Sequence, residues 1–158
     1  MKRTEMPDDG EAGQAGALNL DILPELLGYQ LRRAQILVYA GFSGRLAACG
    51  LTHGQFGLLL VVGANPGSTQ TALAKVFGSN RSVILRMIDK LEQAGLLARK
   101  AQRGDRRSNA IVLTERGEAL VAELRCAVRE HEQRVAGHLS AHELATLMDL
   151  LARLNRAE

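Results

Sequence analysis

The sequence predicts a mainly α-helical protein that carries one small β-hairpin. Apolar residues recur at helical spacing through six segments, and most of these segments begin after a serine or threonine and end at a glycine or proline. One stretch near residue 100 instead has the alternating pattern of two strands and turns at a Gly-Asp pair, as in a hairpin. The 158 residues, of which 46% are apolar and 23% charged, have the length and composition of a single globular domain.

The first 20 residues are expected to form a disordered tail, followed by one folded domain over residues 21–158. The tail is rich in glycine, alanine and acidic residues without periodicity, and it has no apolar stretch of the kind that a secretory signal needs. The longest apolar run, residues 56–64, is far shorter than the roughly 20 residues of a membrane-spanning helix. We therefore expect a cytoplasmic protein.

Six helices are expected, and hydroxyl side chains that can cap a helix N-terminus precede five of them. The helices are predicted at residues 22–49, 53–65, 69–77, 80–94, 115–138 and 141–155. The capping residues are Thr52, Ser68 or Thr69, Ser79, Thr114 and Ser140, the last with Glu143 at the capping-box position. The first helix is too densely apolar to have a single solvated face, so much of it should be buried.

The predicted hairpin consists of "LLARKAQ", residues 96–102, and "NAIVLT", residues 109–114. Its tip gathers Arg103, Arg106 and Arg107 around the turn between them. Residues 75–113 contain nine basic and three acidic side chains, so the positive charge of the chain is concentrated there. Such a surface attracts polyanions by counterion release, although a solvated charged face is the common alternative.

Two short helices followed at once by a hairpin describe a winged helix-turn-helix, here over residues 52–113. In that arrangement the second short helix enters the major groove of DNA, and the hairpin reaches the backbone or the adjoining minor groove. Residues 80–94 form two distinct faces at helical spacing. The apolar face holds Ile84, Met87, Ile88 and Leu91, and the polar face holds Ser82, Arg86, Asp89 and Gln93. The polar face could be only the solvated side of an amphipathic helix, but the hairpin and the local charge together favour contact with DNA bases.

Several motifs resemble those of the MarR-type transcriptional regulators. The resemblance rests on residues 51–100, which begin "LTHGQFG", on "GDRRSNAIVLTERG" in the wing and on the closing "HLSAHELATLMDLLARL", and it covers residues 22–156. It implies an obligate homodimer in which residues 21–50 and 114–158 form the dimerisation helices while two winged domains straddle a palindromic operator. It also implies a ligand-responsive regulator of transcription, here expected to be a repressor.

The resemblance further implies roles for individual residues. Operator bases would be contacted by Ser79, Asn80, Arg81, Ser82 and Arg86, and phosphates by Ser68, Thr69 and Gln70. In the wing, Asp105 would orient Arg107 toward the minor groove. Arg103 and Arg106 would contact the flanking phosphates. The arginines at the hairpin tip would therefore serve DNA binding.

A ligand site is expected where the first and second helices meet. Three of the five aromatic residues lie within residues 39–56, and the candidate ligand contacts there are Tyr39, Phe42, Arg45, His53 and Phe56. The resemblance implies small aromatic acids as ligands, and ordinary core packing is the alternative. The stretch around Arg32 and Arg33 resembles regulators that respond to aryl-CoA thioesters such as hydroxycinnamoyl-CoA, whose phosphates would suit the two arginines. Otherwise these arginines would snorkel to water or pair across the dimer with Glu130 or Glu132.

Other kinds of chemistry find little support in the sequence. His138 and His142 are four residues apart, but Ser140 caps a new helix between them and no third ligand stands nearby, so no metal site is expected. There is no phosphate-binding glycine loop and no nucleophile elbow, so we expect neither an enzyme nor a cofactor. Cys49 and Cys126 fit no disulfide or metal motif and are expected to be free, buried thiols. The alternative function is an architectural or redox-sensing DNA-binding regulator without a small-molecule effector.

Overall fold

The computed structural model describes residues 18–102 and 105–156. Most of the predicted tail and the predicted phosphate contact Arg103 lie outside these residues. The chain divides into two compact units, Met1–Ala34 and Gln35–Glu158. Because the boundary falls inside the first long helix, a single domain over residues 21–158 stays a prediction.

The secondary structure follows the predicted order. The elements are η1 (Leu23–Glu25), α1 (Leu27–Ala48), α2 (His53–Ala64), α3 (Gln70–Val76), α4 (Arg81–Gln93), β1 (Leu97–Gln102), β2 (Asp105–Leu113), α5 (Glu115–Val135), η2 (Ala136–His138) and α6 (Ala141–Leu154). The six predicted helices are confirmed, with two changes at their ends. Leu26 has an extended backbone, with φ −81° and ψ 124°, so the first predicted helix is split into the 3₁₀ turn η1 and the helix α1. The last turn predicted for the fifth helix forms the separate 3₁₀ turn η2.

Four helix N-termini are capped at predicted residues. The caps are Thr52, Thr69, Thr114 and Ser140, and the first and last of these form complete capping boxes with Gln55 and Glu143. The prediction for α4 is wrong, because Asn80 rather than Ser79 is the N-cap residue and its side chain makes no capping hydrogen bond. Ser79 still belongs to the end of the preceding helix, since its N–H donates to the Ala74 carbonyl at 3.1 Å and its hydroxyl donates to the Phe77 carbonyl at 3.1 Å.

The predicted hairpin is confirmed as an antiparallel pair of strands. Its register runs from Leu97 opposite Leu113 to Ala101 opposite Asn109, with an irregularity before Gln102 pairs with Asp105. An isolated bridge joins Ser68 to Ile111 of β2, through N–H to carbonyl hydrogen bonds of 3.0 Å from Gly67 to Ile111 and from Ile111 to Ser68. The segment before α3 is therefore attached to the wing.

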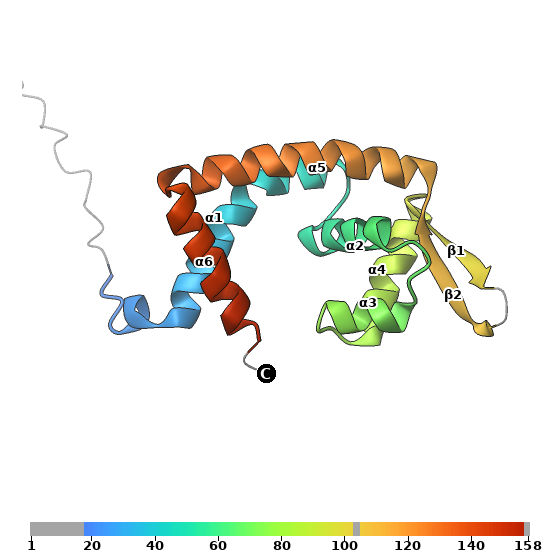
Figure 1. Ribbon diagram of the computed structural model, residues 1–158, viewed down its shortest axis with the longest axis horizontal. Coiled ribbons are helices and arrows are strands. Elements are labelled where there is room, and N and C mark those ends of the chain that lie inside the picture. Colours follow the sequence, from blue (N-terminus) through green and yellow to red (C-terminus); the bar gives the residue numbers. More distant parts are fainter. Residues whose placement is uncertain (1–17, 103–104, 157–158) are drawn as a thin grey trace, which may run out of the picture. The chain divides into compact units, whose positions relative to one another are not determined.

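The elements labelled α2, α3, α4, β1, β2 and α5 in Figure 1, together with the second half of α1, share one apolar core. Its most deeply buried side chains are Leu46, Leu58, Leu59, Val62, Leu73, Ile84, Ile88, Leu91, Leu97, Ile111 and Leu124. Burial of each such side chain contributes about 1.5–3 kcal/mol. The two short helices and the wing are thus fixed to the same base.

The prediction that the first helix is mostly buried is wrong for the single chain. In α1 only Phe42 and Leu46 are buried, whereas Ile36 and Leu37 are 54% and 67% exposed. In α6 no residue is buried, and Met148 is 60% exposed. The apolar density that the sequence shows in these helices therefore finds no cover within the described chain. Exposed apolar surface of this extent is typical of an interface with another chain.

No single helix in the described part of the chain is both long and apolar enough to cross a membrane. Only the bent pair of α1 and α2 meets that test together, on length and composition. Within this pair, α2 is a core helix, because Leu58, Leu59 and Val62 on it are fully buried.

The two cysteines are free thiols, as predicted, but they differ in burial. Cys49 is half-buried next to the core, whereas Cys126 is exposed on α5. The prediction of burial is wrong for Cys126, because α5 turns Leu124 and Val121 rather than Cys126 toward the core.

Candidate functional site

The helix-turn-helix consists of α3, a turn at Gly78 and α4. Gly78 has φ +54°, a left-handed conformation that glycine adopts without a clash from a side chain. Leu73 of α3 and Ile84 and Ile88 of α4 are buried in the same core. The apolar face of α4 is thereby covered, and its opposite face is left to solvent.

The two predicted faces of α4 are largely confirmed. Ile84, Ile88 and Leu91 are buried and Met87 is half-buried. On the other side, the exposed residues include Asn80, Arg81, Ser82 and Arg86, and Ser79 just before them is half-buried. In the major groove, a guanidinium can donate hydrogen bonds to guanine, and an amide can both donate a hydrogen bond to adenine and accept one from it. The structure therefore places the predicted base contacts at the N-terminus of α4 and along its exposed face.

Asp89, predicted on the polar face of α4, has a structural partner instead. Its carboxylate pairs with the guanidinium of Arg99 on β1, and Glu92, one turn further along α4, pairs with the same guanidinium. Arg99 is only 22% exposed, so these ion pairs are partly shielded from water. Sequence reasoning missed Arg99, although two acids three residues apart on a helix, followed by an arginine in the next strand, are a usable signal. The pairs tie α4 to the wing.

The predicted phosphate contacts lie together at the start of α3. Thr69 caps the helix, since its hydroxyl oxygen accepts from the Ala72 N–H at 3.2 Å. The Ser68 hydroxyl donates to the Asn65 carbonyl at 2.7 Å, and the Ser68 backbone is held by the bridge to β2. Gln70 is the first helical residue and is half-buried. The segment is rigidly placed by hydrogen bonds, but the Ser68 hydroxyl already has an acceptor.

The predicted wing contacts are placed only by their backbone. Asp105, Arg106 and Arg107 form the start of β2, and Asp105 pairs with Gln102 of β1 at the end of the hairpin. Arg103 lies outside the described residues. The orientation of Arg107 by Asp105 stays a prediction.

Four of the predicted ligand contacts line one cavity of about 190 Å³. Tyr39 and Phe42 come from α1, and His53 and Phe56 come from α2. The Tyr39 and His53 rings are stacked, with centroids 3.9 Å apart and an angle of 8° between planes, and the Phe42 and Phe56 centroids are 5.7 Å apart. The third wall comes from α5, including Val128. We call this the aromatic cavity.

His131 of α5 also lines the aromatic cavity and was missed by sequence reasoning as a contact. It is 5% exposed, and its Nε2 lies 2.7 Å from the Val38 carbonyl oxygen of α1. Its ring stacks on Phe42 at a centroid distance of 5.8 Å and lies against Gly41, where an added Cβ would come within 2.4 Å of the His131 Cε1. Gly41 therefore lets α5 approach α1 closely.

The Nε2 atom of His53 is buried and has no hydrogen-bond partner among the described residues. The ring is held by its stacking on Tyr39, and Phe42 meets it edge-on with centroids 6.5 Å apart. A buried polar atom without a partner is costly. A polar group of a bound molecule in the aromatic cavity could supply the missing hydrogen bond.

Arg45, Arg32 and Arg33 do not line the aromatic cavity. A guanidinium nitrogen of Arg45 lies 2.7 Å from the Glu123 Oε1, in an ion pair whose two side chains are each more than half exposed. Arg32 and Arg33 are exposed in the first unit of the chain, where the Arg33 guanidinium carbon lies 5.8 Å from the centroid of the Tyr29 ring. A role of these arginines in ligand binding stays a prediction.

No cluster of three or more side chains that could hold a metal ion occurs in residues 18–102 and 105–156. The two histidines His138 and His142, considered above as ligands, are both exposed. The candidate functional site therefore has three parts, which are the exposed face of α4, the hairpin and the aromatic cavity. Helix α2 lines the aromatic cavity and also belongs to the core.

Known proteins resemble this chain in sequence and in fold. The family model described as MarR family matches residues 50–108. A candidate transcriptional regulatory protein for the hcr operon of Thauera aromatica is 36% identical over 133 residues, which cover 84% of this chain and 80% of that protein. A solved structure of the transcriptional repressor CouR bound to a 23-mer DNA duplex is 38% identical, with a TM-score of 0.82 over 89% of this chain and 100% of that chain. CouR bound to p-coumaroyl-CoA is 35% identical, with a TM-score of 0.81 over 90% of this chain and 100% of that chain.

Proposed function

The chain belongs to the MarR family of transcriptional regulators, and on that premise we propose that it is a homodimeric cytoplasmic repressor that an aromatic acid, bound as its CoA thioester, releases from a palindromic DNA operator. The observation that carries the ligand part is the aromatic cavity, where four residues predicted from sequence meet. Because α2 forms a wall of this cavity and also a side of the core that supports α4, a ligand there could influence DNA binding. Dimerisation is supported by the exposed apolar residues of α1 and α6.

The DNA part of the proposal rests on α4, the start of α3 and the wing. Arg81 and Arg86 extend from the exposed face of α4, where they would contact base edges in the major groove. Thr69 and Gln70 would contact the phosphate backbone, and Arg107 would enter the minor groove. The solved structure of the similar repressor CouR with a 23-mer DNA duplex supports DNA binding by this chain.

The size of the aromatic cavity favours an aryl group as the buried part of the ligand. Its volume is about 190 Å³, and an apolar cavity of roughly 150 Å³ is sufficient to hold benzene. The pantetheine and nucleotide parts of a CoA thioester would therefore lie outside it. Their phosphates would need cationic partners, which Arg32 and Arg33 could supply. CouR has been solved with p-coumaroyl-CoA, which has both an aryl and a CoA part.

The unpartnered Nε2 of His53 favours an aryl group that carries a hydroxyl. Such a hydroxyl could donate to or accept from an imidazole nitrogen, depending on the tautomer of His53. A ring without the hydroxyl would leave the nitrogen buried and unsatisfied. We therefore expect hydroxylated aryl thioesters to bind more tightly than their unsubstituted counterparts.

The ligand would act by selecting one conformation of the dimer. It can release DNA only to the extent that it binds the DNA-free conformation more tightly than the DNA-bound one. A ligand held between α1, α2 and α5 is positioned to make such a difference, because α2 connects the aromatic cavity with the winged helix-turn-helix.

The decisive experiment is a selection of duplexes from a random pool, followed by titration of the selected duplex with candidate ligands. We expect a dimer on a palindrome, with affinity that falls steeply as salt rises because bound cations on DNA are displaced. p-Coumaroyl-CoA should release the DNA, and cinnamoyl-CoA, which lacks the ring hydroxyl, should do so less well. In His53→Phe the two thioesters should become equivalent.

The same titration tests the alternatives. A regulator without an effector would keep its DNA at every ligand concentration, and a redox sensor would respond to an added oxidant through Cys49 or Cys126 rather than to a thioester. A stable monomer in sedimentation, or DNA affinity that is indifferent to salt, would overturn the DNA part of the proposal.

A further inference from the structure

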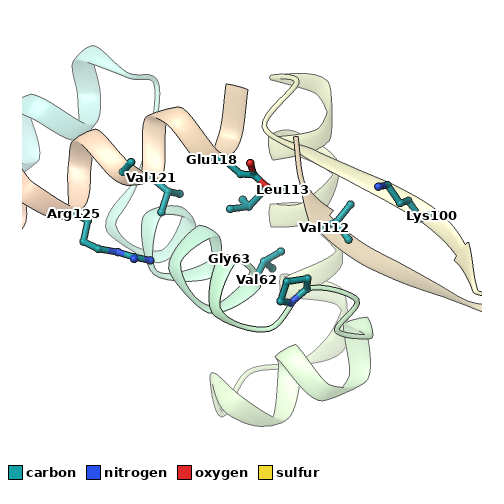
Figure 2. A pocket seen from close by; sticks show the side chains of 10 residues that line it. Val62, Gly63, Lys100, Val112, Leu113, Glu118, Val121 and Arg125 are labelled. Atoms are coloured by element: carbon teal, nitrogen blue, oxygen red, sulfur yellow. The ribbon is translucent and has the colours of Figure 1, made fainter. Parts of the chain in front are cut away.

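A second cavity, of about 400 Å³, lies between α2, the hairpin and the N-terminal half of α5 (Figure 2). It shares no lining residue with the aromatic cavity. Its volume falls in the range of about 300–1,000 Å³ that is common for small-molecule sites. We call it the wing cavity.

The floor of the wing cavity is apolar. Val62 of α2, Val112 and Leu113 of β2 and Val121 of α5 provide it. Gly63 helps to keep the hollow open, because a Cβ at this position would come within 2.9 Å of the Leu113 Cδ1 and would push that side chain away. An organic ligand could therefore bury an apolar body against these side chains.

Three charged side chains stand around this floor. Arg125 and Glu118 come from α5 and Lys100 comes from β1. In Figure 2 the Arg125 guanidinium extends from α5 toward α2, and the Lys100 nitrogen points toward Val112. None of the three forms an ion pair with another residue in the part of the chain that the structure describes. Together they leave one net positive charge around the cavity.

We propose that the wing cavity binds a small monoanionic carboxylate with an apolar body, for which benzoate is the simplest probe. A guanidinium can hold a carboxylate through two parallel hydrogen bonds, and the Lys100 ammonium adds a second positive charge. Glu118 would repel a second negative charge on the ligand, which disfavours dianions and phosphates. The proposal goes beyond the proposed function, because it needs neither the aromatic cavity nor a CoA thioester.

The position of the wing cavity would give such an anion a direct contact with the DNA-binding wing. A ligand whose carboxylate binds Arg125 and whose apolar body lies against Val112 and Leu113 would link α5 to β2. The wing cavity is thus a candidate second input that acts on the base of the wing.

The test is a titration of the full-length protein, labelled in its valine methyl groups, with benzoate followed by NMR. We expect saturable shifts of the Val62, Val112 and Val121 methyls. The neutral isostere benzamide should bind more weakly, because it cannot form charge-assisted hydrogen bonds. The methyls of Val38 and Val128, which line the aromatic cavity, report separately on binding there.

Two variants and a matched control locate the site. Arg125→Ala should weaken benzoate binding roughly tenfold or more, whereas Arg129→Ala, which removes an exposed arginine one turn further along α5, should not change it. Ala122→Phe would fill the cavity without removing a charge and should abolish the shifts. Spectra of both variants without ligand show whether the fold is intact.

Three outcomes would overturn the proposal. The first is a linear response of the Val62, Val112 and Val121 methyls without saturation. The second is an equal effect of Arg125→Ala and Arg129→Ala, which would indicate general attraction of an anion to a basic surface. The third is a set of shifts confined to Val38 and Val128. None of these results bears on release of DNA by a CoA thioester, so the proposed function can stand or fall separately.

Discussion

The guanidinium of Arg99 on β1 is paired with the carboxylate of Asp89 on α4, so charge as well as the apolar core holds the wing to the helix that is proposed to read DNA. This ion pair gives Asp89 a structural role. On its position in the helix alone this residue belongs to the polar face that reads bases, yet its carboxylate is directed to the wing. The relative position of the two DNA-contacting elements therefore depends in part on one partly buried arginine.

Asp89→Asn should weaken operator binding even though it removes a negative charge near the DNA. Electrostatics alone predicts tighter operator binding, because the loss of one acidic group lowers the repulsion from the DNA phosphates. The loss of stability should be small, at most about 1 kcal/mol, since the pair is partly exposed. Fluorescence anisotropy with the selected operator and with random duplex measures the effect. Asp149→Asn, an exposed acid of α6, is the control, and tighter operator binding by Asp89→Asn would contradict the positioning role.

Arg86→Ala and Arg107→Ala should alter sequence preference in different ways. Loss of Arg86 should relax preference at one base position in each half-site, at a cost of roughly 1–3 kcal/mol. Loss of Arg107 should weaken binding to A·T-flanked operators more than to G·C-flanked ones, because narrow A·T-rich minor grooves attract arginine. Selections repeated with each variant measure both effects. If both variants weakened all sequences equally, both residues would be plain phosphate contacts.

Gly41→Ala should destabilise the protein, because the new methyl group would overlap the His131 ring. Overpacking of this kind costs about 1–3 kcal/mol. Gly44→Ala in the same helix is the matched control, since no heavy atom lies within 4 Å of its added Cβ, and it should stabilise α1 by up to about 1 kcal/mol. Urea unfolding at one fixed protein concentration compares the variants. The double variant Gly41→Ala/His131→Ala should recover part of the loss, and a failure to do so would place the strain elsewhere.

Features with local causes could be predicted from the sequence. The caps at Thr52 and Ser140 follow from residue types at fixed spacing, and the two faces of α4 follow from the helical period. The aromatic cavity was also within reach, because Tyr39, Phe42 and Phe56 are spaced so that two consecutive helices can bring them together. In each case the residues that decide the feature lie within one or two turns of helix or on neighbouring elements.

Features that depend on distant contacts could not be predicted in this way. His131 meets Val38 and Gly41, which are 93 and 90 positions away in the sequence, and no local pattern in α5 predicts these contacts. Ser79 has the right residue type for a cap, but the turn at Gly78 keeps it in the end of α3. The apolar density of α1 predicts burial correctly only if a second chain is available to cover it.

The stability of the α6 N-terminus should depend on pH through Glu143. The Ser140 side chain and then the Ser140 backbone donate hydrogen bonds to its carboxylate, and both lower the pKa of Glu143 below its ordinary value. A carboxyl group with a lowered pKa stabilises the fold above its ordinary pKa, and this contribution is lost as the pH falls through the pKa of the folded state. Glu143→Ala should therefore lower the melting temperature at neutral pH, with a difference from the parent that shrinks in acid. A difference that is independent of pH would show that only helix propensity had changed.

The double variant Arg32→Ala/Arg33→Ala should lose affinity for an aryl-CoA thioester while its affinity for the free aryl acid stays the same. The reason is that the free acid has no phosphates, whereas each charge-assisted hydrogen bond from a guanidinium to a phosphate contributes about 1.5–3 kcal/mol. Calorimetric titration of p-coumaroyl-CoA and p-coumarate into the parent and the double variant measures the difference. Arg129→Ala controls for the loss of positive charge in general.

The contrary possibility is that these arginines only reach water or pair with Glu130 or Glu132 of the second subunit. In that case the double variant would bind the thioester as tightly as the parent, and Glu130→Gln/Glu132→Gln would weaken the dimer in sedimentation. Thioester affinity that falls in the arginine variant, together with an unchanged dimer in the glutamine variant, would assign Arg32 and Arg33 to the phosphates of the ligand.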